Sequence, residues 1–299
     1  MVDTEDYSTL CSKEDWREIV AWVGDLPPMP QVASRAIKVI ENPAFDAKEL
    51  CEIIETDSAL ASRVLKIANS VMFCRQREIT TLNQALMMIG MKSIKGIIMA
   101  AVLRHMGGNL GVIHKLVWEH SIATAMLALS LANYLGYNNS DELFLLGLLH
   151  NLGQVVLLSR GESEKKYQEV LKLIKENNFS YFNAEQKVFG FTNPLIGALV
   201  AKKWNFPSDT SQVILHYQDD TPLFSSELQQ DYKMMIVKLS DLLAHKAQLG
   251  SPEGYPVKES DFSELAKKLK ILVDDAPQVF SDLISSATER FQETQNVYE

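Results

Sequence analysis

The segment from Asp57 to Ser70 has the sequence DSALASRVLKIANS. Its apolar residues recur every three to four positions, which is the spacing of one face of an α-helix and not the alternation of a β-strand. Asp57 stands just before this pattern and is a residue type whose side chain accepts hydrogen bonds from the first backbone N–H groups of a helix. The segment therefore predicts a helix that begins after Asp57 and ends near Asn69.

The same helical spacing continues on both sides of this segment. It predicts helices over residues 14–23, 31–41, 47–55, 83–89, 91–105, 112–135, 141–149, 163–176, 181–189, 194–204, 207–216, 232–248, 260–272 and 276–293. No run of alternating apolar and polar residues bounded by turn residues is present, so the sequence predicts an all-α fold, a multi-helix bundle. Asn193 and Pro194 are expected to be the N-cap and the first residue of their helix. Met87, Met88, Met91 and Met99 are expected to fill the core.

Composition and charge exclude several classes of protein. The chain has 299 residues, of which 46% are hydrophobic and 22% charged, with a net charge of -9. An acidic chain is poorly suited to a phosphate backbone, so general nucleic-acid binding is not expected. The apolar stretches fall short of the ~20 residues that span a bilayer. The first residues lack the basic and apolar parts of a secretory signal, and the three cysteines are odd in number and far apart. We therefore expect a reduced, cytoplasmic protein without a membrane span.

Three polar residues lie in apolar or helical surroundings where they need partners. His120 lies inside the predicted helix 112–135, His150 follows an apolar run in GLLHNLG (147–153), and Asp241 lies in KLSDLL (238–243). A buried polar group without a partner destabilises a fold. We therefore expect the three side chains to converge in the folded chain.

At these positions the sequence resembles the HD superfamily of metal-dependent phosphohydrolases, in which the order His…His-Asp…Asp is spread over the helices of a bundle. It is more similar to the HDOD subgroup, the HD-related output domain of bacterial signalling proteins. The similar segments, in order, are LPPMP (26–30), DSALASRVLKIANS (57–70), residues 79–90 with NQA and IG, GLLHNLG (147–153), then Glu185, Gly190, Gly197 and WNFP (204–207). The similarity extends roughly from Leu26 to His245, and it implies an HD-domain-like bundle with an N-terminal helical subdomain.

The resemblance, together with two glycine-rich breaks, gives a domain organisation. The breaks lie at residues 107–111 and 250–256. We expect an N-terminal tail (1–13), an N-terminal helical subdomain of the HDOD region (14–107), an HD-like helical subdomain (108–250) and a C-terminal helical extension (251–299).

The sequence also departs from the family pattern. The resemblance implies metal ligands at His120, His150 and Asp241. The residue after the second His is Asp in the superfamily and is Asn151 here. Hard divalent cations prefer charged oxygen ligands, so Asn151 is a weak candidate ligand that cannot bridge two metal ions as an anion. Where the subgroup has a further His the chain has Asn193, and where many members have a His pair it has His216-Tyr217.

Three interpretations of this cluster are open from the sequence. It is a buried polar cluster satisfied by hydrogen bonds, a degenerate site for one weakly bound divalent metal ion (Mg²⁺, Mn²⁺ or Fe²⁺), or a competent hydrolytic site. Hydrolysis needs a metal-bound water and a group that handles its proton. With Asn151 in place of an anionic metal ligand, we assign no catalytic residue, and no cofactor other than the one weakly bound ion is expected. The expected function is a non-catalytic regulatory or scaffold module of bacterial signal transduction, which acts on signalling proteins in trans. The alternative is a metal-dependent phosphohydrolase acting on a nucleotide or a cyclic dinucleotide.

Overall fold

The computed structural model describes residues 19, 24, 29–42, 44, 46–69, 79–106, 111–159, 161–218, 228–272 and 274–298. Every regular element in this part of the chain is an α-helix, so the all-α prediction is confirmed. The predicted tail (1–13), almost all of the predicted helix 14–23 and residues 107–110 of the glycine-rich break lie outside the described residues.

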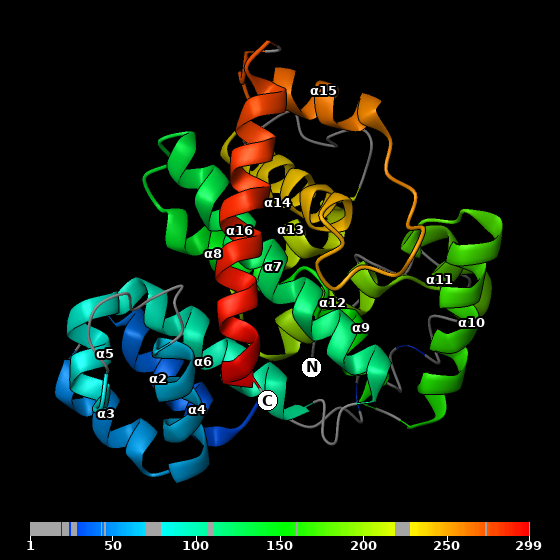
Figure 1. Ribbon diagram of the computed structural model, residues 1–299. Coiled ribbons are helices and arrows are strands. Elements are labelled where there is room, and N and C mark those ends of the chain that lie inside the picture. The colour runs from blue at the N-terminus through cyan, green and yellow to red at the C-terminus, as the bar shows by residue number, and fades with distance from the viewer. Residues whose placement is uncertain are drawn as a thin grey trace.

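The helices form two groups that meet in the middle of the molecule (Figure 1). The N-terminal group comprises α2 (Gln31–Glu41), α3 (Ala47–Glu55), α4 (Ser58–Ala68), α5 (Leu82–Ile89) and α6 (Met91–Met106). The second group comprises α7 (Val112–Tyr134), α8 (Ser140–Leu149), α9 (Leu152–Leu158), α10 (Gly161–Asn177), α11 (Tyr181–Phe189), α12 (Asn193–Lys203), α13 (Ser208–His216) and α14 (Leu228–Lys246). Helix α6 packs against α8 and joins the two groups.

The C-terminal helices cover the second group and reach the first. Helix α15 (Glu259–Lys268) packs on α14, and α16 (Ala276–Tyr298) contacts both α7 and α4. In Figure 1, α16 is the red helix that runs down the front of the molecule from α15 towards the N-terminal group. The C-terminal extension is therefore packed against the helix that contains His120.

Close packing of α7 on α8 fixes the centre of the second group. Residues 120–128 of α7 are all buried, so this helix has no solvent-exposed face there. A Cβ added at Gly147 of α8 would lie 2.9 Å from the Cα of Ala125 and 3.0 Å from the carbonyl oxygen of Thr124. The two backbones approach to a distance that only glycine allows. This contact places the end of α8, and His150 just after it, beside α7.

One helical stretch among the described residues is long and apolar enough to cross a membrane by length and composition. It spans Ser140–Leu158, and 89% of it is buried inside the protein. It contains all of α8, then His150 and Asn151, and all of α9. Burial among the other helices accounts for its apolar composition, because a helix that is hydrophobic on all sides is typical of a protein core.

The predicted helix ends agree with the structure at several positions and fail at others. Asp57 accepts hydrogen bonds from the backbone N–H groups of Ala59 and Leu60, as expected for an N-cap. The prediction for Asn193 is wrong by one residue: Thr192 is the N-cap, and Asn193 is already helical. The expectation of core methionines is wrong for Met87 and Met88, which are 87% and 51% exposed, and is confirmed for Met99, which is buried. The side chain of Met91 lies outside the described residues.

Candidate functional site

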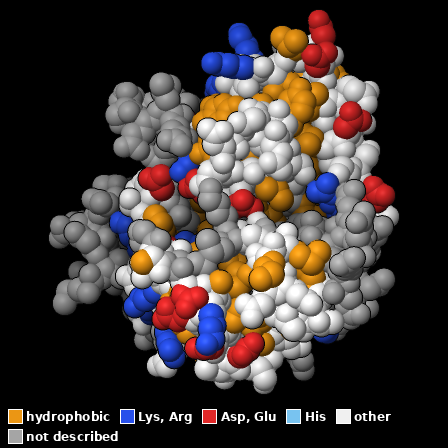
Figure 2. All heavy atoms as spheres, turned by 90° about the vertical axis from the view of Figure 1, so that its left-hand side faces the viewer, with side chains coloured by type: hydrophobic (Ala, Val, Ile, Leu, Met, Phe, Trp, Pro, Cys, Tyr) orange, Lys and Arg blue, Asp and Glu red, His pale blue; other side chains and the backbone are white. Residues whose placement is uncertain are grey.

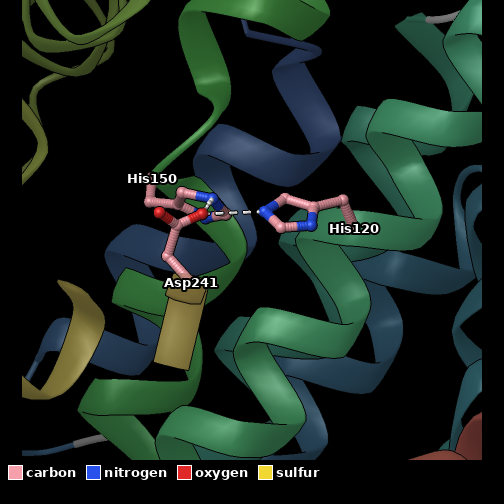
Figure 3. Close-up of side chains that lie close together, drawn as sticks. All are labelled: His120, His150 and Asp241. Atoms are coloured by element: carbon pink, nitrogen blue, oxygen red, sulfur yellow. Dashed lines mark hydrogen bonds and ion pairs between the residues drawn. The ribbon is translucent and has the colours of Figure 1, made fainter. Parts of the chain in front are cut away.

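The structure brings the three predicted side chains together from three separate elements (Figure 3). His120 comes from α7, His150 from the junction of α8 and α9, and Asp241 from α14. Asp241 Oδ1 lies 2.8 Å from His120 Nε2 and 3.5 Å from His150 Nε2. One ligand atom from each of the three residues lies within 4.8 Å of the other two, and all three residues are buried.

Backbone carbonyl groups determine which nitrogen of each ring faces the carboxylate. His120 Nδ1 donates to the carbonyl oxygen of Leu249 at 3.2 Å, and His150 Nδ1 donates to that of Gly147 at 2.6 Å. A carbonyl oxygen can only accept, so Nδ1 carries a proton in both rings. His120 Nε2 also makes a hydrogen bond with Asp241 Oδ1 at 2.8 Å, whereas Nε2 of a neutral His150 has a free lone pair. His150 Nε2 is buried and makes no hydrogen bond. This nitrogen lies 3.5 Å from Asp241 Oδ1, and both atoms are hydrogen-bond acceptors. A cation between them would bind both lone pairs.

A fourth buried residue, His245, belongs to the cluster and is absent from the predicted set. It lies one turn after Asp241 on α14, and its Nε2 is 3.5 Å from Asp241 Oδ1. Its Nδ1 lies 2.7 Å from the hydroxyl oxygen of Ser251. The ring stacks on His120 on one side, at 4.2 Å between ring centroids, and on Tyr255 on the other, at 3.6 Å. Three imidazoles thus surround one carboxylate oxygen.

The charges in the cluster are set by competition between burial and proximity. Burial would raise the pKa of Asp241, but the imidazoles of His245, His120 and His150 outweigh it and hold that pKa well below its usual range. Burial, assisted by His120, lowers the pKa of His245 well below its usual range, and burial also lowers the pKa of His150. Near neutral pH the cluster therefore contains an ionised carboxylate beside two neutral imidazoles.

A second buried polar cluster is centred on Glu185 of α11. Its carboxylate accepts hydrogen bonds from the Tyr167 hydroxyl at 2.8 Å, from Gln154 Nε2 at 3.1 Å, and from the backbone N–H and Nδ2 of Asn193 at 2.7 and 3.2 Å. Burial raises the pKa of Glu185 despite these four donors. Asn193, where the resemblance implies a His, is therefore bonded to Glu185.

Two other departures from the family pattern lie next to the His–Asp cluster. Asn151 is buried in the turn between α8 and α9. Tyr217 is also buried, and its ring meets the ring of His150 edge to face at 5.3 Å. At this side of His150 the described residues thus supply an aromatic ring and no additional imidazole or carboxylate ligand.

The ligand atoms fit a single divalent metal ion. Two ligands that each lie ~2.1 Å from an ion, at the angles of tetrahedral or octahedral coordination, are separated by roughly 3.0–3.4 Å. The separations from Asp241 Oδ1, 2.8 Å to His120 and 3.5 Å to His150, lie close to that range. Metal-bound histidines typically donate their second ring N–H to a backbone carbonyl or a carboxylate, as His120 and His150 do. His120 Nε2, His150 Nε2 and Asp241 Oδ1 are the atoms that would bind such an ion.

The helical bundle with a buried His–Asp cluster defines an HD-like protein. Within that class, the HDOD domain family matches residues 26–220, more than half of the chain. The protein therefore belongs to the HDOD family.

Comparison with individual proteins supports the same fold. An HDOD domain protein of unknown function from Geobacter sulfurreducens is 22% identical, with a TM-score of 0.78 over 99% of both chains. A provisionally named phosphohydrolase from Shewanella amazonensis SB2B is 19% identical, with a TM-score of 0.69 over 94% of this chain and 98% of its own. An uncharacterised protein of Treponema pallidum (strain Nichols) is 25% identical over 197 residues, which are 64% of this chain. The chain spans 37% of the length of that relative.

Proposed function

We propose that this HDOD protein is a non-catalytic regulatory module of bacterial signal transduction whose His–Asp cluster weakly binds one divalent metal ion. The single observation that supports this proposal is the buried, unpartnered Nε2 of His150, 3.5 Å from the Asp241 carboxylate, next to Asn151 in place of a second carboxylate. The first two residues supply ligands for one ion. Asn151 supplies no negative charge that would bridge a second ion.

Hydrolysis is not supported by the surroundings of the cluster. A hydrolytic metal site needs an activated water, a group that transfers its proton and space for the phosphoester. His120, His150 and Asp241 are 2%, 1% and 6% exposed, and the ring of Tyr217 covers one side of His150. We therefore infer that a bound ion stabilises the module and does not attack a substrate.

The donor atoms favour some metals over others. Two imidazole nitrogens and one carboxylate oxygen suit Fe²⁺ and Mn²⁺ better than Mg²⁺, which prefers oxygen ligands and retains several waters. A buried cluster leaves little room for those waters. We expect Mn²⁺ and Fe²⁺ to bind more tightly than Mg²⁺.

Surface charge favours proteins over nucleic acids as partners. The net charge is -9, and on the face in Figure 2 acidic and basic side chains lie next to one another, with hydrophobic side chains in scattered patches. Nucleic-acid binding depends on a concentration of basic residues. We propose signalling proteins of the cytoplasm as partners that bind in trans.

The test measures metal content and activity on the same protein. Protein purified without added metal is analysed for bound metal by mass spectrometry, and is then assayed with Mn²⁺ or Mg²⁺ against phosphomonoesters and cyclic dinucleotides. We expect Mn²⁺ or Fe²⁺ at no more than one ion per chain, and no turnover. Turnover that disappears in His150→Ala would instead establish the hydrolase alternative. Affinity capture from native cytoplasm, identified by mass spectrometry, tests for signalling partners.

A further inference from the structure

The three imidazoles around Asp241 differ in the hydrogen-bond partner of Nδ1, the ring nitrogen that points away from the carboxylate. For His120 and His150 the partner is a backbone carbonyl oxygen, which can only accept a hydrogen bond. For His245 the partner is the hydroxyl of Ser251, 2.7 Å from Nδ1. The Ser251 hydroxyl can direct its single proton at His245 Nδ1, at 2.7 Å, or at the Pro252 carbonyl oxygen, at 3.4 Å, a contact near the limit of hydrogen bonding. A hydroxyl can donate as well as accept, so His245 is not restricted to the tautomer that a carbonyl partner imposes.

This difference gives His245 a distinct role towards the carboxylate. If Ser251 donates its hydroxyl proton to Nδ1, the proton of the neutral ring lies on Nε2. Nε2 then directs an N–H at Asp241 Oδ1, from which it is separated by 3.5 Å. A small rotation of the carboxylate would shorten this contact to a hydrogen bond. A neutral His150 cannot donate in this way, because its single proton is used on Nδ1.

We propose that His245 is a positioning residue for the metal site: it donates from Nε2 to the Asp241 carboxylate, and Ser251 sets the tautomer that allows it. This inference rests on the proposed binding of a metal ion at His120, His150 and Asp241. Carboxylate ligands are generally oriented by such outer hydrogen bonds. His245 therefore orients the only negatively charged ligand of the cluster.

The segment that contains Ser251 contacts the cluster at several of its residues. We call residues 249–255, which lie between α14 and α15, the strap. The Leu249 carbonyl accepts from His120, Ser251 contacts His245, and the Tyr255 ring stacks on His245 at 3.6 Å with an interplanar angle of 14°. With His120 on its other face, the His245 ring is fixed in the plane that directs Nε2 at Asp241. The strap is thus part of the metal site, although it supplies no ligand.

The experiment compares Mn²⁺ affinity, measured by isothermal titration calorimetry, among variants of the full chain. His245→Leu removes the donor, and we expect the affinity to fall by roughly 10- to 100-fold, the usual effect of losing an outer-shell partner. His245→Gln retains an N–H donor on a side chain of similar reach, and we expect it to restore most of the affinity. Ser251→Ala retains the ring but removes the hydroxyl that sets the tautomer, and we expect an intermediate loss.

Lys246→Gln is the matched control, because Lys246 is the next residue on α14 and pairs with Glu259 at 2.8 Å on the surface. Its affinity should equal that of the parent. A purely structural role for His245 would not distinguish Gln from Leu, so equal losses in those two variants overturn the inference. Parent-like affinity in His245→Leu overturns it as well and leaves the proposed metal binding intact. Absence of Mn²⁺ binding in the parent overturns both. If circular dichroism shows that His245→Leu is unfolded, Ser251→Ala decides: parent-like affinity there rejects the inference.

Discussion

The backbone of Gly250 lies directly against the backbone of His120. A Cβ added at Gly250 would be 2.1 Å from the His120 nitrogen, and Gly250 has a φ of +60°. The adjacent carbonyl of Leu249 accepts from the same histidine. The strap therefore fixes His120 through both a steric contact and a hydrogen bond.

We expect Gly250→Ala to lower the free energy of unfolding by at least about 3 kcal/mol, because strain at positive φ is added to the clash with α7. Gly254 is the matched control: its φ is +76° and no atom lies within 4 Å of an added Cβ. Gly254→Ala should therefore lose only about 1 kcal/mol. Urea unfolding of the two variants compares these losses. Equal losses in the free energy of unfolding would show that the close contact between Gly250 and α7 does not restrict the side chain at this position.

Asn151→Asp should make stability depend on metal. In a chelator the new carboxylate is buried next to His150 without a counter-ion, so desolvation should lower the melting temperature below that of the parent. Added Mn²⁺ or Fe²⁺ should restore it, since an ion at 100 times its Kd stabilises the folded state by about 2.7 kcal/mol. The parent should respond much less. If the melting temperature of the variant is the same in chelator and in added metal, Asn151 does not face a metal site.

The metal-free protein should lose stability as the pH falls below about 6.5. In the folded state the pKa values of His150 and His245 are lowered from 6.5, chiefly by burial. The unfolded chain therefore binds more protons in this range, and the free energy of unfolding decreases with falling pH until the folded pKa values are reached. Urea unfolding at pH 7.5 and 5.5 in a chelator measures this decrease. His245→Gln should reduce the slope, and an unchanged slope would contradict a neutral His245.

The hydrogen bond from Tyr167 to the buried Glu185 should contribute measurably to stability. Tyr167→Phe removes a donor at 2.8 Å from the carboxylate, and bonds to charged groups contribute about 1.5–3 kcal/mol. Tyr134→Phe is the control, because Tyr134 is 53% exposed and its change should stay within about 0.5 kcal/mol. Urea unfolding compares the two variants; similar effects would mean that Glu185 is satisfied without Tyr167.

Short-range patterns in the sequence predict the fold, because helical spacing predicts its elements. The resemblance to the HD superfamily, together with the need of buried polar groups for partners, predicts that His120, His150 and Asp241 converge. His245 also has a sequence signal, since a spacing of four residues places it on the same helix face as Asp241. The contact from Leu249 has no such signal, because every residue has a backbone carbonyl.

The errors at Asn193 and at Met87 and Met88 have a common physical origin: both features are decided by contacts between elements, which local sequence patterns do not show. Thr192 and Asn193 are both suitable N-cap residues, and proline is tolerated at either of the next positions. The buried carboxylate of Glu185, eight residues earlier, decides between them by accepting from Asn193. Likewise, helical spacing does not reveal which part of a short helix such as α5 is covered by its neighbours.

The cluster crosses the boundary of the family match. That match ends at residue 220, whereas Asp241, His245 and the strap all come later in the chain. A fragment cut at that boundary would retain both metal-facing histidines and lose the carboxylate between them. The part of the chain that the family match covers is therefore shorter than the part that builds the cluster. The Geobacter sulfurreducens structure aligns over 99% of both chains, so the fold that the two proteins share includes the C-terminal helices.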